Sequence, residues 1–375
     1  MRIAINTRFL LEGQLEGIGR YSYEICKRLV EQHPEDDFIF LFDRAYSEHF
    51  VFGANVTAVA LPPPARHPLL WYLWFEWAIP LALRKYKADV FFSPDGYLSL
   101  RSDVPTLLCV HDIAFVHFPE LISGAVSRFY RYFTPKYLKK AVKIATVSLF
   151  VKNDIKKHYR IADAKIAVTY NGVQAEFLPL SQSEKERVKA DFSQGQDYFF
   201  FVGAVHPRKN VHRMIAAFDE FKRKSSSKVK LLIAGRFAWQ TAEVKKAFDA
   251  ATCQSDILFL GFVSENDLPR LMGAAMAFVW VSLFEGFGIP LLEAMHAEVP
   301  IITSTVSAMP EVAGDAAILV NPESISEIAK AMAAINSDMD LRCRLVSAGK
   351  LQREKFNWDS SADLVYKLLK EVAAC

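Results

Sequence analysis

Short, continuously apolar segments alternate with amphipathic segments along this chain of 375 residues. The apolar segments predict strands at 2–6, 38–42, 56–61, 90–93, 106–110, 144–147, 198–202, 230–234, 257–260, 277–281, 301–303 and 317–319. Helical periodicity lies between them, as at 21–31, 211–224 and 325–334. Strands that are apolar throughout indicate sheets covered on both faces, as in parallel α/β folds. The two groups of strands predict two doubly wound domains.

A polar stretch at 179–196 separates the two groups of strands and is rich in residues that favour turns. We interpret this stretch as the linker, which gives a first domain at 1–178 and a second domain at 179–356. The sequence has no internal repeat of fixed period, and this excludes a solenoid.

The composition is that of a folded protein, with 51% hydrophobic and 23% charged residues. Lysine and arginine number 45 against 42 acidic residues, so the net charge of +3 does not indicate a nucleic-acid partner. The five cysteines are far apart and form no C-x-x-C pair, which favours a reducing, cytoplasmic location. The first six residues predict a strand and not a signal peptide.

The segment 69–83 is strongly apolar, but it is shorter than the ~20 residues that span a bilayer, and Glu76 and Pro80 interrupt it. It therefore predicts a buried or interfacial helix. The segment 128–143 is basic and aromatic at helical spacing, for which a solvated helix face is the default interpretation. Because 69–83 also contains three tryptophans, contact with an anionic membrane surface is the alternative. Both interpretations stay open.

The stretch 282–295, SLFEGFGIPLLEAM, carries the strongest chemical signal. It follows an apolar strand, and Pro290 predicts the first turn of a helix. Gly286 and Gly288 let the backbone pass close to a ligand, and the start of the helix favours an anion. We expect the carboxylates of Glu285 and Glu293 to face one crevice. The alternative is that Glu293 only complements the helix dipole.

The segment His206-Pro-Arg-Lys-Asn210 precedes a second predicted helix, and we expect Asn210 to cap that helix through its side chain. Arg208 and Lys209 lie beside the positive end of the helix dipole, where cations are unfavourable unless an anion lies among them. A diphosphate fits this requirement. The alternative is that both side chains point into water.

Two further motifs follow predicted strands of the first half. Gly17-Ile-Gly-Arg-Tyr21 lies between a strand and a helix, where it indicates either a tight turn or a phosphate-binding loop. His111-Asp112 ends the strand at 106–110, at the sheet edge where open α/β proteins bind ligands. A histidine at such an edge is otherwise structural, and we assign no role to Asp112.

The stretch from Glu285 to Glu293 resembles the E-x7-E motif of retaining GT-B glycosyltransferases of family four. The resemblance implies two Rossmann-like domains that face each other across a deep cleft, with a C-terminal helix at 357–375 that returns to the first domain. It implies that Glu285 acts on the donor sugar and that Glu293 binds the ribose. It also implies that a backbone turn binds the sugar and phosphate, namely Gly286, Phe287, Gly288 and Ile289.

The same resemblance extends to the other motifs. It implies that Gly17 and Gly19 belong to a loop over the donor diphosphate, and that His111 contacts the donor sugar. Two positions depart from the family pattern, since Val281 stands where a proline is usual and Ala204 stands where an arginine is usual. Lys209 keeps its family position, and we expect Arg208 to replace the missing arginine.

The resemblance implies a retaining hexosyltransferase. We identify no aspartate cluster of the metal-binding D-x-D type, so we expect no metal and no cofactor, with Lys209 and Arg208 stabilising the leaving nucleoside diphosphate. His111 would orient the sugar and Glu285 would stabilise it. The Pro-Arg-Lys-Asn segment is similar to bacterial mannosyltransferases of surface-polysaccharide assembly. We therefore expect GDP-mannose as the donor, a glycan or lipid-linked acceptor, and a cytoplasmic location that includes peripheral contact with the membrane.

The sequence leaves other donors and a non-catalytic role open, and it excludes an oxidoreductase. UDP-glucose or UDP-N-acetylglucosamine would suit the same fold as donor, and a non-catalytic subunit that binds nucleotide-sugars would retain the same motifs. An NAD-dependent oxidoreductase requires G-x-G-x-x-G after its first strand, and the spacing of Gly13, Gly17 and Gly19 does not match.

Overall fold

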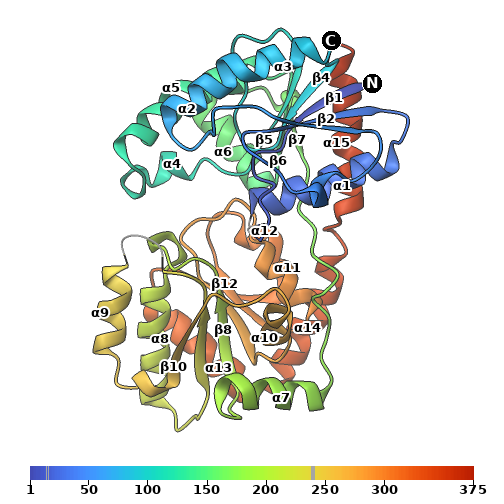
Figure 1. Cartoon of the computed structure of the whole chain (residues 1–375). Helices are drawn as coiled ribbons and strands as arrows, with labels where there is room; N and C mark the ends of the chain where they lie inside the picture. The colour runs from blue at the N-terminus through green and yellow to red at the C-terminus, as the bar shows by residue number, and fades with distance from the viewer. Residues whose placement is uncertain (14, 16, 238–240) are drawn as a thin grey trace. The chain divides into compact units, whose positions relative to one another are not determined.

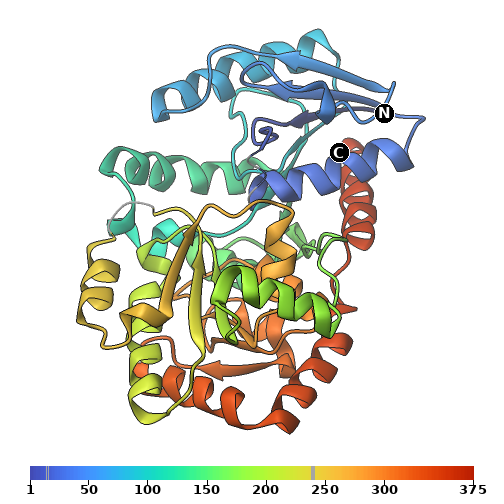
Figure 2. The same ribbon diagram turned by 60° about the horizontal axis from the view of Figure 1, so that its bottom comes forward.

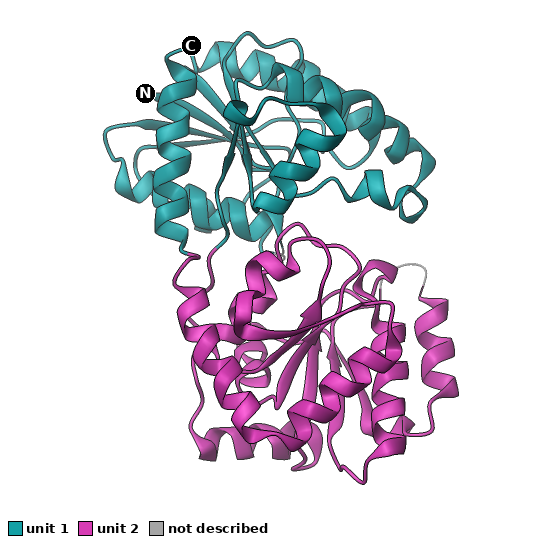
Figure 3. Cartoon of the chain, turned by 180° about the vertical axis from the view of Figure 1, so that it is seen from behind, with its two compact units in different colours: residues 1–171, 357–375 teal, residues 172–356 magenta. Residues whose placement is uncertain are grey.

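The computed structural model describes residues 1–13, 15, 17–237 and 241–375. These residues form two compact units, which are residues 1–171 with 357–375 and residues 172–356 (Figure 3). The chain thus crosses between the units at 171/172, and residues 172–178 belong to the second unit, whereas we expected them in the first domain.

The first unit contains a parallel sheet of seven strands in the order β3-β2-β1-β4-β5-β6-β7 (Figure 1). The strands are β1 (Arg2–Asn6), β2 (Asp37–Phe42), β3 (Val56–Ala60), β4 (Val90–Ser93), β5 (Thr106–Val110), β6 (Lys143–Thr146) and β7 (Ile166–Val168). The strand order reverses between β1 and β4, and ligands of doubly wound folds bind at the carboxyl ends beside such a point.

The helices of the first unit are α1 (Ile18–Gln32), α2 (Pro68–Leu73), α3 (Ile79–Lys85), α4 (Ala114–His117), α5 (Gly124–Lys140), α6 (Leu149–Tyr159) and α15 (Trp358–Ala373). Helix α15 packs against α1 and against β4 and β5, so the C-terminal segment is part of this unit. Its Ser361 hydroxyl donates a 2.5 Å hydrogen bond to the carbonyl of Tyr170.

The apolar segment 69–83 forms α2, a π-helical turn at Trp74–Ala78 and α3 in succession. Trp74 and Phe75 are buried in the core of the unit, whereas Trp77 is half exposed. Within the part of the chain that the structure describes, no helix is both long and apolar enough to cross a membrane.

The second unit contains a parallel sheet of six strands in the order β10-β9-β8-β11-β12-β13. The strands are β8 (Tyr198–Val202), β9 (Lys230–Ala234), β10 (Ile257–Gly261), β11 (Ala277–Trp280), β12 (Ile301–Ser304) and β13 (Ala317–Val320). The helices are α7 (Gln182–Ser193), α8 (Val211–Lys224), α9 (Ala242–Ala250), α10 (Asp267–Gly273), α11 (Ile289–His296), α12 (Met309–Ala313), α13 (Ile325–Ser337) and α14 (Met339–Arg353).

The predicted strands are all present, and each of their ends lies within one residue of the predicted end. Every residue of β4, β5, β9, β11 and β12 is buried. Because successive side chains point to opposite faces, both faces of each sheet are covered in these strands, as the continuous apolar pattern predicts. Among the strands of the described residues, β7 alone was missed, since three residues give too short a pattern to recognise.

The predicted linker at 179–196 is wrong, because its central part forms helix α7 in the second unit (Figure 1, Figure 2). Ser181 and Glu184 form a capping box at its start. Good helix-forming residues without proline or glycine follow this cap, and α7 packs against α10. The polar composition reflects an exposed helix face and not a flexible connection.

Candidate active site

The glycine turn of the second unit connects β11 to α11. Helix α11 begins at Ile289 and has Pro290 in its first turn, one residue earlier than the predicted start. Gly288 precedes it with φ 98°, a left-handed conformation that favours glycine. A Cβ atom at Gly288 would lie 2.7 Å from the Cε atom at the flexible end of Met309, so the backbone conformation and not the packing is what favours glycine.

Glu285 lies on this turn and forms ion pairs with both cations of the His206–Asn210 segment. The Lys209 Nζ lies 2.7 Å from Oε1 of Glu285, and the Arg208 Nη1 lies 3.3 Å from Oε2. The same Arg208 nitrogen donates to the carbonyl of Phe284 at 2.7 Å, and the Lys209 ammonium lies 4.2 Å from the centre of the Trp280 ring. The structure therefore brings together three residues that we assigned to the site from two separate motifs.

The charge of Glu285 depends on this arrangement. Burial by itself raises the pKa of Glu285, but the nearby Lys209 and Arg208 outweigh it and leave the pKa below its ordinary value. Glu285 is therefore ionised at neutral pH. The two cations face one carboxylate, so the three groups together carry a net positive charge that suits an anionic ligand.

Asn210 is the N-cap residue of α8, as predicted, but its side chain makes no capping hydrogen bond. Its backbone is left-handed with φ 60°, and its side-chain amide instead donates to the carbonyls of Val281 at 2.9 Å and Pro322 at 2.7 Å. The side chain is thereby directed away from the first N–H groups of the helix. Asn210 connects the segment that carries Arg208 and Lys209 to the end of β11.

The backbone of Glu285 is held by the segment that follows β12. The Glu285 N–H donates to the Ser307 hydroxyl at 3.1 Å, and the Ala308 N–H donates to the Glu285 carbonyl at 3.3 Å. Glu293 lies on α11 and is buried. The structure thus fixes Glu285 through its backbone as well as its side chain, and it places Glu293 in the interior of the same unit.

In the first unit, His111 directly follows β5, as predicted. Its Nε2 lies 2.7 Å from the carbonyl of Pro94, which can only accept, so Nε2 carries the proton. Burial lowers the pKa of His111, although the Pro94 carbonyl and Asp112 act in the opposite direction. The imidazole is therefore neutral at pH 7, and Nδ1 is its acceptor nitrogen.

The Gly17–Tyr21 motif contacts His111, which lies in the same unit, through the ring of Tyr21. Gly17 precedes α1 with φ 47°, and Gly19 is buried within the first turn of the helix. Tyr21 lies edge-on to the His111 ring with their centres 4.9 Å apart, and its hydroxyl lies 3.1 Å from the hydroxyl of Thr169. The sequence assigned no role to Tyr21, although it belongs to the motif.

Sequence reasoning also missed a buried ion pair beside His111. Arg8 follows β1 and donates from Nε to Asp95, which follows β4, at 2.5 Å. Asp95 also accepts from the backbone of Tyr97, whose ring stacks on the Arg8 guanidinium. The sequence signal that could have found them is a charged residue two positions after each of these strands, at the ligand-binding edge of the sheet.

Our interpretation that the sequence has no D-x-D triplet is wrong, because Asp338-Met339-Asp340 is one. It lies at the start of α14, where Asp338 accepts a 2.8 Å hydrogen bond from the Leu341 N–H. Asp338 therefore acts as a helix cap.

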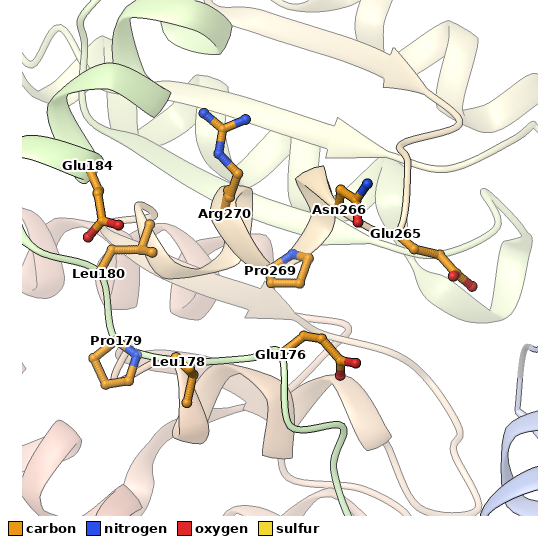
Figure 4. Close-up of a pocket in the computed structure, with 9 residues that line it drawn as sticks. All are labelled: Glu176, Leu178, Pro179, Leu180, Glu184, Glu265, Asn266, Pro269 and Arg270. Atoms are coloured by element: carbon orange, nitrogen blue, oxygen red, sulfur yellow. The ribbon is translucent and has the colours of Figure 1, made fainter.

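A pocket of about 320 Å³ in the second unit does not coincide with the predicted site (Figure 4). It is lined by Glu176, Leu178, Pro179, Leu180, Glu184, Glu265, Asn266, Pro269 and Arg270. Three carboxylates and one cation make this pocket unfavourable for a diphosphate. None of the residues predicted to bind the donor lines it.

Two protein-family models match this chain. "Glycosyltransferase Family 4" matches residues 15–177, and "Glycosyl transferases group 1" matches residues 182–352. The chain is 28% identical to O-antigen chain mannosyltransferase B of Escherichia coli, over 95% of this chain and 97% of that protein. It is also 28% identical to O-antigen chain mannosyltransferase RfbU of Salmonella typhimurium, over 82% and 84%.

The fold is also similar to that of solved structures. The Anabaena protein HepE, in complex with UDP and glucose, aligns with a TM-score of 0.78 at 16% identity and covers 99% of this chain and 100% of that one. Together the two family matches include most of both units. This chain belongs to the GT-B glycosyltransferases of family four.

Proposed function

We propose that this glycosyltransferase is a retaining, metal-independent mannosyltransferase that uses GDP-mannose to build a surface polysaccharide. The observation that carries the proposal is the contact of Lys209 and Arg208 with Glu285 beside the glycine turn and the start of α11. This arrangement supplies cations for a leaving diphosphate and a carboxylate for the positive charge that develops on the sugar.

The chemistry follows from the charges. Departure of the nucleoside diphosphate leaves negative charge near Lys209, Arg208 and the N-terminus of α11. Because Glu285 already holds both cations in place, little reorganisation is needed when this charge appears. The acceptor hydroxyl then attacks from the face that the diphosphate leaves and gives its proton to a diphosphate oxygen. The anomeric configuration is retained.

His111 has a separate role in this proposal. Its Nε2–H is already directed to Pro94, and its neutral ring presents Nδ1 as an acceptor. A neutral acceptor suits a sugar hydroxyl better than a phosphate oxygen, which carries no proton at neutral pH. We therefore assign His111 to the orientation of the donor sugar, and Gly17 and Gly19 to the loop over the diphosphate.

The choice of mannose rests on the relatives that are named O-antigen mannosyltransferases. Calorimetric titration with GDP and with UDP tests the base, and turnover with GDP-mannose, UDP-glucose and UDP-N-acetylglucosamine tests the sugar. We expect GDP to bind and GDP-mannose to react. Tight binding without any turnover would instead favour a non-catalytic subunit that binds nucleotide-sugars.

Retention and metal independence have their own tests. The product of GDP-α-mannose should be an α-mannoside by NMR, and turnover should persist in EDTA. A β-mannoside would contradict the retaining mechanism. Loss of turnover in EDTA that magnesium or manganese restores would contradict the assignment of the leaving-group charge to Lys209 and Arg208.

We further propose a cytoplasmic enzyme that contacts an anionic membrane through α2, α3 and α5. Leu69, Leu73, Trp77 and Leu81 recur every four residues, and between 36% and 62% of each is exposed. Helix α5 packs against α2 and adds an exposed tyrosine and several cations. Apolar anchors beside basic side chains are typical of interfacial helices.

Sedimentation with vesicles tests this contact. We expect binding to vesicles that contain phosphatidylglycerol, weaker binding to pure phosphatidylcholine, and loss of binding when Trp77 and Leu81 are both changed to serine. Equal sedimentation of the parent and this double variant would contradict the proposal.

A further inference from the structure

Two histidines and one aspartate form a cluster in the first unit, outside the residues assigned to the donor. Asp154 and His158 lie four residues apart on α6, and His117 is the last residue of α4. The His117 Nε2 lies 2.8 Å from one carboxylate oxygen of Asp154, and the His158 Nε2 lies 3.3 Å from the other. Each residue offers one ligand atom, and these atoms lie within 4.8 Å of one another. Among the described residues, this is the one such group of histidine, cysteine, aspartate or glutamate side chains.

We propose that His117, Asp154 and His158 bind a divalent transition-metal ion, for which zinc is the representative probe. Two imidazoles and one carboxylate suit zinc, nickel, cobalt or copper, whereas magnesium and calcium require mostly oxygen ligands. In a tetrahedral zinc site the ligand atoms lie about 3.3 Å apart. The 3.3 Å between His158 Nε2 and one Asp154 oxygen matches this value, whereas the 2.8 Å between His117 Nε2 and the other oxygen is shorter. Side-chain rotations that bring both imidazoles to the same oxygen would complete the geometry.

The three side chains differ in exposure, so one would hold a metal ion from the interior and the other two would let it enter from solvent. The Asp154 side chain is 7% exposed, whereas those of His117 and His158 are 30% and 31% exposed. The carboxylate is thus fixed from the interior, and the imidazoles open to solvent, with water as a fourth ligand. On α6, Lys152 and Lys156 both pair with Asp163, whose carboxylate offsets part of their positive charge.

The location of the cluster indicates that a bound metal ion would position the segment that carries His111. The segment from His111 to His117 is held at its start by the Pro94 carbonyl, and Asp112 accepts a 2.9 Å hydrogen bond from the first N–H of α4. A metal ion at the other end would join α4 to α6. It would therefore restrain the segment that carries His111 without contact with the donor.

Zinc titration of the full chain tests the proposal. The protein carries no histidine tag, the thiols of the exposed Cys343 and Cys375 are alkylated because thiolates bind zinc, and bound metal is removed with EDTA before dialysis. We expect calorimetry to show one zinc ion per chain and zinc chloride to raise the melting temperature. His158→Asn should weaken the affinity at least about 100-fold, since even outer-shell partners of a metal are worth about 10- to 100-fold.

Two further variants sharpen the test. Asp154→Asn should weaken the affinity similarly, and if its buried amide prevents folding, the exposed His158 still decides the outcome. His49→Asn changes an exposed histidine outside the cluster and should leave zinc affinity unchanged. Absence of zinc binding by the parent, or equal binding by His158→Asn, would overturn the proposal and leave a hydrogen-bonded cluster without metal.

The same variant separates this site from the proposed catalysis. If EDTA lowers turnover in the parent but not in His158→Asn, the effect belongs to this cluster. If EDTA abolishes turnover in both proteins, a metal acts elsewhere and the metal-independent mechanism fails. In that case the zinc titration still decides the cluster by itself.

Discussion

The Lys209 ammonium lies 2.7 Å from the Glu285 carboxylate, and this contact joins two segments that are 76 residues apart in the sequence. Glu285 also holds Arg208, so one buried carboxylate positions both cations of the Pro-Arg-Lys-Asn segment. The pair explains why two adjacent cations are tolerated before α8. Part of their charge is compensated by Glu285 on the neighbouring strand connection and not by the helix that follows them.

Lys209→Ala should weaken the binding of the nucleoside diphosphate by about 2–3 kcal/mol, because it removes a charge-assisted contact. Titration calorimetry with GDP measures the change. Lys222→Ala is the matched control, since Lys222 lies on α8 of the same unit and pairs with Asp256. Equal affinities of the parent and Lys209→Ala would place the diphosphate elsewhere.

Glu285→Gln should lower stability in a manner that depends on pH. The pKa of Glu285 is lowered in the folded chain, so its ionised form stabilises folding above the ordinary glutamate pKa of about 4.3, and this contribution is lost as the pH falls through the lowered value. Urea unfolding at pH 7 and below pH 4 should show a difference between parent and variant that shrinks at the lower pH. A constant difference would mean that the charge of Glu285 contributes no stability.

His111→Ala should reduce turnover by about 100-fold or more, while the affinity for free GDP changes little, because the contact is made to the sugar in the transition state. Steady-state kinetics and calorimetry on this variant measure both quantities. His111→Asn should recover part of the activity, since its side-chain oxygen lies near the position of Nδ1. Nearly normal turnover of His111→Ala would make His111 a structural residue that only holds Pro94.

Asn210→Asp should destabilise the chain by about 2–3 kcal/mol, because the buried carboxylate cannot donate to the carbonyls of Val281 and Pro322. Urea unfolding measures the loss. Asn321→Asp is the control, since the side-chain oxygen of exposed Asn321 accepts from the Glu323 N–H, which an aspartate also does. A loss of equal size in both variants would show that the amide of Asn210 contributes nothing specific.

Much of the fold could be predicted because it depends on short-range patterns. A strand that is buried on both faces must be apolar throughout, and for this reason all the predicted strands were found. Gly288 was recognisable because the backbone turn into α11 favours a residue that adopts φ 98°. The segment 179–196 was misread because polar composition was given more weight than the Ser181–Glu184 capping signal.

The site depended on contacts that no local pattern contains. The sequence by itself determined the motifs, their residue types and the sheet edges at which they end. The tertiary structure decided that Glu285 pairs with Lys209, that Asn210 donates to Val281 and Pro322 and not to α8, and that His111 is neutral. A charge or hydrogen bond between distant segments depends on the distance between side chains and on their burial, and only the packed fold sets both.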